Sequence, residues 1–336
     1  MKKHYIIPFF ITHRGCPFTC VFCRQEKISG RDKSPEPHDI APIVRDYLET
    51  MPRKNVRVEA AFFGGSFTGL PVALQHKYLE SLKPFLASGK LHGIRLSTRP
   101  DFIDKPILDM LKKYRVSRVE LGVQSLSDRI LKKVKRGHTS SDVREASRLI
   151  LKNRMALGHQ MMVGLPGSTL KDELMTAEGS IALGASEVRI YPVLVIKGTH
   201  LAKLWKAGKY SPLTEEEAVR RCAKLISLFE SHKTRVIRCG LHPSEGLLSG
   251  KDVLAGPFHV SFRQKVETRI YRNMFRAFLK RDKRSAAVSL IHCNPRDAAY
   301  VIGHERSNAA YLEKALKKRV AFKQSPACKP GTVRIE

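Results

Sequence analysis

The sequence predicts an α/β protein, in which a partial (βα)6 barrel is followed by a smaller C-terminal α/β extension. Short segments rich in apolar or β-branched residues alternate with amphipathic segments through the first half of the chain and beyond. Each short segment is stopped by Gly, Pro or Ser, which is typical of a strand that runs into a turn. Because successive βα units form a parallel sheet with right-handed connections, six of them predict a sheet that curls toward a barrel.

Six strands and five helices follow from this alternation. The predicted strands are Tyr5–Thr12, Val56–Phe63, Gly93–Ser97, Arg118–Val123, Ala156–Val163 and Glu187–Val195. The predicted helices between them are Asp39–Thr50, Pro71–Ala87, Lys105–Lys113, Ser140–Asn153 and Thr169–Leu183. Functional residues of such a sheet lie at the C-terminal ends of its strands, so we expect the site there.

The rest of the chain is organised differently. A further amphipathic helix is predicted at Thr214–His232, and a loop rich in Gly and Pro follows over Gly240–Pro257. We therefore divide the chain into a barrel over residues 1–235 and a basic extension over residues 236–336, which we expect to pack on the barrel.

Positive charge is the most unusual feature of the composition. The 336 residues contain 61 Lys and Arg against 31 Asp and Glu, which gives a formal net charge of +30. Residues 261–336 alone hold 18 Lys and Arg against 6 Asp and Glu. This excess argues against most enzymes with an acidic surface and favours a polyanionic partner.

The chain also indicates its compartment. No apolar run reaches the ~18–20 residues that a membrane helix needs. The apolar N-terminus is interrupted by Pro8 and followed by Arg14 without a cleavage site, so we interpret it as the first strand and not as a signal peptide. Seven cysteines, an odd number, do not favour a disulfide framework. We expect a cytoplasmic protein without a membrane partner.

A row of cations predicts where a polyanion would bind. Residues 261–280 have the pattern of one helix, and five basic residues fall within one narrow sector of it. These residues, the basic stripe, are Lys265, Arg269, Arg272, Arg276 and Lys280. A solvated helix face is the simpler interpretation. Together with the local charge, however, the stripe favours RNA, with tRNA as the first choice, bound without sequence-specific reading.

Three cysteines lie within eight residues directly after the first predicted strand. Cys16, Cys20 and Cys23 have the spacing C-x3-C-x2-C. Three thiolates cannot complete a tetrahedral zinc site or an all-cysteine cluster without a fourth ligand. They do suit a [4Fe–4S] cluster with one iron left open to a ligand. The alternative is a zinc ion with a distant fourth ligand such as His13 or Cys239.

This cysteine pattern after the first strand of a βα barrel resembles the radical S-adenosylmethionine (radical SAM) enzymes. The Gly-Gly-Ser-Phe-Thr segment at residues 64–68 and the Ser-Thr-Arg-Pro-Asp segment at residues 97–101 are similar to the branch that contains the Elongator catalytic subunit. The resemblance implies a radical SAM barrel, a [4Fe–4S] cluster, SAM, a low-potential electron donor and reductive cleavage of SAM to a 5′-deoxyadenosyl radical. With the basic stripe it implies modification of a tRNA or other RNA base.

The same resemblance implies which residues hold SAM. The backbone of the Gly-Gly segment would receive the amino group, a Gln after the fourth strand the ribose, and an Arg after it the carboxylate. The residues that the resemblance assigns to cofactor binding are Phe22, Gly64, Gly65, Ser66, Arg99, Gln124, Arg136 and Gln160. Two departures stand out: the common family form has Glu in place of Ser66, and one branch has Asp in place of Gln160.

Several other residues are candidates of lower rank. His242, His304 and Glu245 lie in motif-like loops that could line the site, and His159 faces either the core or the site. Cys222, on the apolar face of its helix, is expected in the core. The unassigned cysteines Cys239, Cys293 and Cys328 are expected as buried thiols.

Other functions remain open at the level of sequence. A radical SAM enzyme could act on a small metabolite or a protein. The chain could also be a non-enzymatic, metal-stabilised nucleic-acid-binding protein. The Elongator catalytic subunit carries an acetyltransferase domain after the region of resemblance, whereas this sequence ends at Glu336, so we do not expect acetyl-CoA chemistry.

Overall fold

The computed structural model describes residues 3–11, 14–17, 20–29, 33–52, 55–241, 244–281 and 288–336. The chain folds as two compact units. Unit 1 comprises Met1–Leu213 and Leu228–Phe258, and unit 2 comprises Thr214–Ser227 and His259–Glu336. The division therefore differs from a single boundary after residue 235, because the chain leaves unit 1 through a helix and returns to it.

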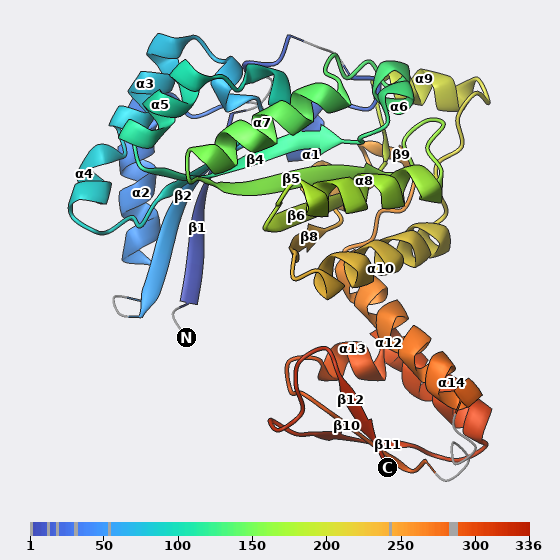
Figure 1. Cartoon of the computed structure of the whole chain (residues 1–336). Coiled ribbons are helices and arrows are strands. Elements are labelled where there is room, and N and C mark those ends of the chain that lie inside the picture. The colour runs from blue at the N-terminus through green and yellow to red at the C-terminus, as the bar shows by residue number, and fades with distance from the viewer. Residues whose placement is uncertain are drawn as a thin grey trace. The chain divides into compact units, whose positions relative to one another are not determined.

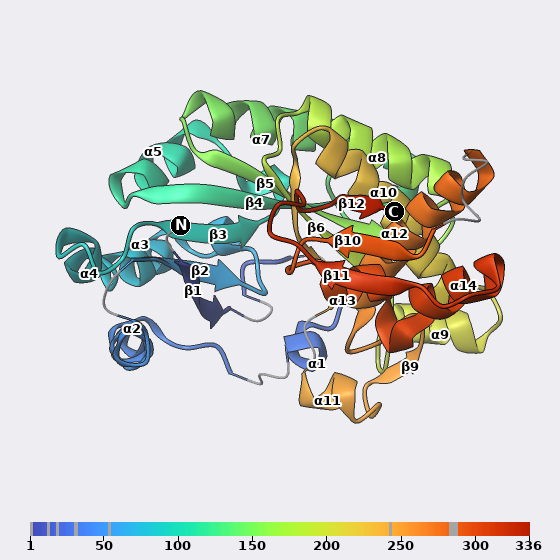
Figure 2. The ribbon, with the colours of Figure 1, turned by 90° about the horizontal axis from the view of Figure 1, so that it is seen from below.

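Unit 1 is built on a seven-stranded parallel sheet with helices, which confirms the predicted fold class (Figures 1 and 2). In order across the sheet, the strands are β1 (Lys3–Phe10), β2 (Val56–Phe63), β3 (Ile94–Thr98), β4 (Val116–Gln124), β5 (Ala156–Val163), β6 (Glu187–Pro192) and β8 (Arg235–Cys239). All six predicted strands are present. The seventh, β8, extends the sheet beyond β6, with which it pairs in parallel.

Helices connect successive strands, and in Figure 1 α5, α7 and α8 lie along one face of the sheet. The helices of this unit are α1 (Gln25–Ser29), α2 (Ile40–Glu49), α3 (Val72–Glu80), α4 (Lys83–Ala87), α5 (Lys105–Lys113), α6 (Asp128–Lys133), α7 (Ser140–Lys152), α8 (Leu170–Ala182), α9 (His200–Lys206) and α11 (Glu245–Leu248). The single helix predicted at Pro71–Ala87 is wrong, because it is divided into α3 and α4. The second helix begins at Lys83, and Pro84 follows in its first turn. Proline has no N–H to donate to a carbonyl of the preceding turn, so the first helix does not continue through it.

The two faces of the sheet carry different side chains. Ile94 and Leu96 of β3 are fully buried and apolar, as expected under a helix layer. His159 of β5 belongs to this layer, because its Nε2 lies 3.1 Å from the Ser147 hydroxyl on α7. Burial lowers the pKa of His159 to about 3, so it stays neutral. This answers the question that the sequence left open: His159 is a core residue.

The opposite, concave face holds a network of buried charges centred on Arg95. Its guanidinium lies 2.6 Å from Glu187 of β6, 3.6 Å from Glu120 of β4 and 3.7 Å from Glu59 of β2. Arg118 reaches Glu187 at 3.3 Å. The charged residues of each strand alternate with apolar ones, so one face is ionic and the other apolar. The network fills the N-terminal half of the half-barrel.

Unit 2 is a small α/β structure, as predicted for the C-terminal extension. The helix α10 (Glu215–Ser231) is divided between the two units. The long helix α12 (Phe262–Arg281) belongs to unit 2 alone. Its sheet has the order β11-β10-β12, with β10 parallel to β11 and antiparallel to β12. The remaining elements are β10 (Leu290–Cys293), α13 (Ala298–Ile302), α14 (Ser307–Leu316), β11 (Ala321–Gln324) and β12 (Val333–Ile335). Tyr271 and Phe275 of α12 pack against Ile291 of β10 in its core.

A short antiparallel pair, β7 (Val195–Ile196) with β9 (Val253–Ala255), completes the elements of unit 1. Among the described residues, no helix is both long enough and apolar enough to cross a membrane.

Replacement of Arg95 by methionine tests the charge network. The change would leave three buried carboxylates without their shared cation, so we expect the free energy of unfolding to fall by about 3–5 kcal/mol. Chemical denaturation followed by circular dichroism measures it. Arg148→Met, which removes an exposed partner of Glu145, is the control and should leave the transition unchanged. Equal effects of the two changes would contradict this account of the network.

Candidate functional site

A cavity of about 860 Å³ lies at the C-terminal ends of the strands of unit 1. Its lining includes all three residues predicted to bind metal and all eight predicted to bind the cofactor. These are Cys16, Cys20, Cys23, Phe22, Gly64, Gly65, Ser66, Arg99, Gln124, Arg136 and Gln160. Residues from four strands, β2 to β5, or from the segments after them thus share one space with the cysteine loop, as expected of a parallel sheet.

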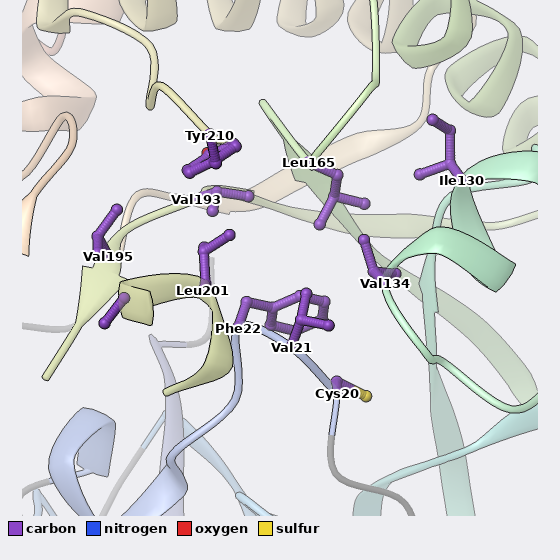
Figure 3. Close-up of a cluster of buried hydrophobic side chains, with 11 residues drawn as sticks. Cys20, Val21, Phe22, Ile130, Val134, Leu165, Val193, Val195, Leu201 and Tyr210 are labelled. Carbon is purple, nitrogen blue, oxygen red and sulfur yellow. The ribbon is translucent and has the colours of Figure 1, made fainter. Parts of the chain in front are cut away.

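The cysteine loop is anchored by an apolar cluster. Figure 3 shows Val21 and Phe22 among buried apolar side chains that include Leu165 and Leu201, with Cys20 at the margin. The Cys23 amide donates to the Cys20 carbonyl at 3.0 Å, which forms a turn. Packing of the intervening residues therefore fixes the backbone that carries the second and third cysteines.

The environment of the Cys23 thiol raises its pKa in the absence of a bound cation. Burial, with a further contribution from Cys20, raises the pKa of the Cys23 thiol to about 12, while Arg136 opposes the rise. A metal centre binds thiolates and would reverse this shift. Among the described residues, no group of three His, Cys, Asp or Glu side chains converges on a single ion position.

The glycines after β2 allow the cysteine loop to approach the sheet. A Cβ on Gly65 would lie 2.2 Å from the Ile11 carbonyl oxygen and 2.6 Å from that of Arg14. A Cβ on Gly15 would lie 2.2 Å from the Ser66 carbonyl oxygen, and the Ser66 amide donates to Arg14 at 3.1 Å. Only glycine permits such contact between two backbones. The prediction that these glycines make room for a ligand is therefore incomplete, because Gly65 first makes room for the cysteine loop.

Ser66 ties the end of β2 to the end of β3. Its hydroxyl lies 2.9 Å from the Thr98 hydroxyl and accepts from the Arg99 amide at 3.2 Å. The Arg99 side chain is buried and forms a bidentate ion pair with Asp101, at 2.8 and 2.9 Å. Arg99 thus lines the cavity paired with a carboxylate from its own loop, and its assignment to the cofactor stays a prediction.

Gln124 and Arg136 form the polar wall closest to the cysteines. Arg136 donates to the Gly122 carbonyl at 2.7 Å and its guanidinium lies 3.6 Å from the Cys20 sulfur. A Cβ on Gly122 would lie 2.7 Å from that guanidinium, so this glycine keeps its place open. Gln124 has a positive φ of 63°, which is strained for a residue with a side chain. Within the described part of the chain, Gln124 Oε1 and Arg136 Nε are buried and lack hydrogen-bond partners.

Gln160 is held differently. Its amide nitrogen donates to the Ser97 hydroxyl at 2.9 Å and to Glu120 at 3.3 Å. Glu120 also accepts from Arg189 at 2.6 Å. Gln160 therefore joins the charge network to the floor of the cavity.

The sequence did not single out three polar residues of the cavity, which are Arg189, Tyr191 and Arg238. Their signal was present: arginine and tyrosine occupy alternate positions in Arg189-Ile190-Tyr191, as do the charged residues of the other strands. Such alternation predicts one polar face, although it takes the curvature of the sheet to make that face a lumen.

Other candidates lie elsewhere. Residues 13 and 242, two of the candidate histidines, fall outside the described residues. Cys239 is buried, and neither it nor Glu245 is among the residues that line the cavity. His304 belongs to unit 2, where its ring lies 5.4 Å from that of His259. Cys222 and Cys293 are buried as expected, whereas Cys328 is half-buried.

The basic stripe lies on α12 and is partly neutralised within unit 2. Lys265 pairs with Glu215 at 2.6 Å, and Arg269 pairs with Glu216 at 3.2 Å. Arg272 donates to the Asn308 side chain at 2.6 Å and stacks on Tyr311. Two of the five cations that the sequence assigns to RNA binding are therefore paired with carboxylates, and their contact with RNA stays a prediction. Their partners lie on α10, some fifty positions earlier, which helix periodicity alone does not show.

Family models match most of the chain. The model of the Radical SAM superfamily covers residues 10–178, half of the sequence, and that of the Radical_SAM C-terminal domain covers residues 185–272. The chain belongs to the radical SAM superfamily. It is therefore an enzyme of that superfamily, as the resemblance predicted.

Curated relatives match the same region. The tRNA uridine(34) acetyltransferase of Methanocaldococcus infernus is 31% identical over 194 residues, which are 52% of this chain and 36% of that protein. Elongator complex protein 3 of Schizosaccharomyces pombe is 29% identical over 192 residues, 51% of this chain and 35% of that protein. The chain is homologous to their radical SAM region and spans little more than a third of their length.

Solved structures share the fold. The archaeal Elp3 of Methanocaldococcus infernus with an N-terminal deletion superposes with a TM-score of 0.64 at 20% identity, covering 84% of this chain and 68% of that one. SuiB of Streptococcus suis superposes with a TM-score of 0.50 at 11% identity, covering 75% and 52%. This confirms the radical SAM half-barrel.

Substitution of Gly65 by alanine tests the contact between the cysteine loop and the sheet. The new methyl group would displace the backbone of the loop, so we expect a marked loss of iron and sulfide bound after anaerobic reconstitution, together with a destabilisation of about 1–3 kcal/mol. Gly89→Ala is the control, because nothing lies within 4 Å of its Cβ position; its positive φ of 71°, which Gly65 does not share, makes it a stringent control for backbone strain without a clash. Normal iron content in the Gly65 variant would contradict the structural role of this contact.

Proposed function

We propose that this enzyme binds a [4Fe–4S] cluster through Cys16, Cys20 and Cys23, binds SAM at the open iron, and modifies an RNA base, with tRNA as its substrate class. One observation carries the proposal: the three cysteines share a cavity with Gln124 and Arg136, each of which keeps a buried polar atom without a partner among the described residues. Such atoms are costly to bury unless a ligand satisfies them.

The donors of the cavity fit the cofactor. Arg136 offers an unused Nε–H to a carboxylate, and Gln124 offers an unused carbonyl oxygen to a hydroxyl group, in agreement with the roles that the resemblance implied. Gly64 has a positive φ of 92° and lines the cavity, so its backbone is open to an amino group. The guanidinium of Arg136 also places a positive charge 3.6 Å from the Cys20 sulfur, beside the predicted ligands of the cluster.

When bound and reduced, the cluster would supply the electron that cleaves SAM into methionine and a 5′-deoxyadenosyl radical. The protein's own contribution is to position and to shield. Phe22, Leu194 and Ile196 give the cavity an apolar wall that limits access of water to a reactive species. Gln160, held by Ser97 and Glu120, is fixed and has no ionisable group, so we assign it a positioning role and no proton transfer.

RNA is the substrate class that charge and kinship favour together. The net charge of +30 suits a polyanion, and relatives of the radical SAM region are named for tRNA uridine modification. By analogy we take a tRNA uridine as the leading candidate, a low-potential protein as the electron donor, and the cytoplasm as the location. Arg276 and Lys280 are the cations of the basic stripe with neither an ion pair nor a hydrogen bond to another described side chain, and they would contact RNA phosphates.

The production of 5′-deoxyadenosine tests the chemistry. The reconstituted and reduced enzyme should release 5′-deoxyadenosine from SAM, and addition of bulk tRNA should increase the rate. Cys20→Ala should abolish the product, because the cluster then lacks a ligand, whereas Cys328→Ala in unit 2 should retain it. Product that is insensitive to tRNA would redirect the search to small metabolites or proteins. A zinc-loaded protein without product would refute the radical enzyme.

Salt dependence tests the basic stripe. The slope of log K against log salt concentration for tRNA binding falls by about one for each phosphate contact that is lost. We expect Arg276→Gln with Lys280→Gln to reduce this slope by about two. Lys265→Gln with Arg269→Gln, which removes the same charge from residues that are already paired, should reduce it less. Equal slopes in both double variants and the native protein would exclude this surface.

A further inference from the structure

A pair of arginines from β6 and β8 lies in the wall of the cavity. Arg189 of β6 and Arg238 of β8 are direct register partners on neighbouring parallel strands, and both side chains line the cavity. Like charges that face each other on adjacent strands repel, so the arrangement costs free energy unless an anion compensates it. Neither residue was predicted from the sequence to contact a ligand.

The charges of the cavity do not balance. Four arginines line it, whereas no Asp or Glu is found among its described lining residues. Arg99 is paired with Asp101, and Arg189 is paired with Glu120. Arg136 is assigned above to the cofactor. Arg238 is different, because the described part of the chain provides it with neither an ion pair nor a hydrogen bond.

The neighbours of Arg238 suit a negatively charged group. Tyr191, two positions after Arg189 on β6, lines the cavity with both arginines and interacts electrostatically with each of them. Together these side chains offer N–H and O–H donors around one point of the cavity wall. A guanidinium recognises carboxylate and phosphate oxygens through two parallel hydrogen bonds, which are among the strongest that proteins form.

We propose that Arg238, with Arg189 and Tyr191 beside it, binds an oxyanion of the second substrate, the molecule that receives the radical. The proposal rests on the proposed function, in which SAM occupies the part of the cavity near the cysteines. The origins of the two arginines support separate roles: Arg136 follows α6 and lies beside the Cys20 sulfur, whereas Arg238 reaches the cavity from β8. The oxyanion is a phosphate if a nucleotide of RNA enters, or a carboxylate if a small co-substrate does.

Direct binding of two anions tests this site without RNA and without turnover. We would measure the affinity of the full-length, cluster-loaded protein for inorganic phosphate and for acetate by titration calorimetry at constant ionic strength. Native protein, Arg238→Gln and Arg238→Met would be compared. The second variant keeps an aliphatic side chain of similar reach in case the first folds poorly. Arg235→Gln is the matched control, because it lies on the same strand, is 64% exposed and does not line the cavity.

We expect both Arg238 variants to bind one of the anions about tenfold more weakly than the native protein, since one charge-assisted contact is lost. Arg235→Gln should bind as the native protein does. Loss for phosphate alone identifies a nucleotide phosphate, and loss for acetate alone identifies a carboxylate. Equal affinities in all four proteins would overturn the proposal, and so would an equal loss in the Arg235 control. These outcomes are independent of the test of the RNA proposal. If RNA is not the substrate, SAM cleavage will not respond to tRNA, whatever the anion affinities are.

Discussion

The ion pair between Arg95 and Glu187 determines the shape of the molecule around the site. Arg95 lies on β3 and Glu187 on β6, three strands apart, yet their charged groups are 2.6 Å from each other. In a flat sheet, about 14 Å would separate the two strands. The contact is therefore favoured by a sheet that curls, and the same guanidinium also lies near carboxylates of β2 and β4. Four strands are thus held around one buried cation.

This network has consequences for the cavity above it. Buried ion pairs contribute little net stability, because desolvation offsets most of their attraction, but a partner that is removed leaves a costly charge. The network therefore constrains geometry more than it stabilises. Glu120 connects the network to the cavity, because it accepts hydrogen bonds from Arg189 and Gln160 and so fixes the positions of both side chains. The half of the lumen that is filled with charge leaves the other half, at the strand ends, for ligands.

Local patterns were sufficient to predict most of the barrel and the residues that meet in its cavity, whereas long-range pairings could not be predicted from them. β2, β5 and α5 have the predicted bounds, because alternation, helix period and turn residues are local signals. The strand β8 was not predicted. Its five residues, Arg-Val-Ile-Arg-Cys, form a short segment interrupted by two arginines, and its pairing with β6 is not visible in the sequence. The carboxylates that neutralise Lys265 and Arg269 lie on another helix, and the clash that requires Gly65 involves a backbone more than fifty positions away. No window of sequence contains these partners.

The distribution of polar groups across the cavity follows from the chemistry that a radical enzyme must contain. A reactive species formed near the cysteines has to meet its target before it meets water, so cofactor and target must share one enclosed space. The carboxylate of the cofactor and an oxyanion of the target would repel each other in one space unless separate cations hold them. Arg136 beside the Cys20 sulfur and Arg238 on β8 provide such cations, and both lie in a cavity whose other two arginines are already paired. Each ligand can therefore be held by an arginine of its own, without competition for one positive charge.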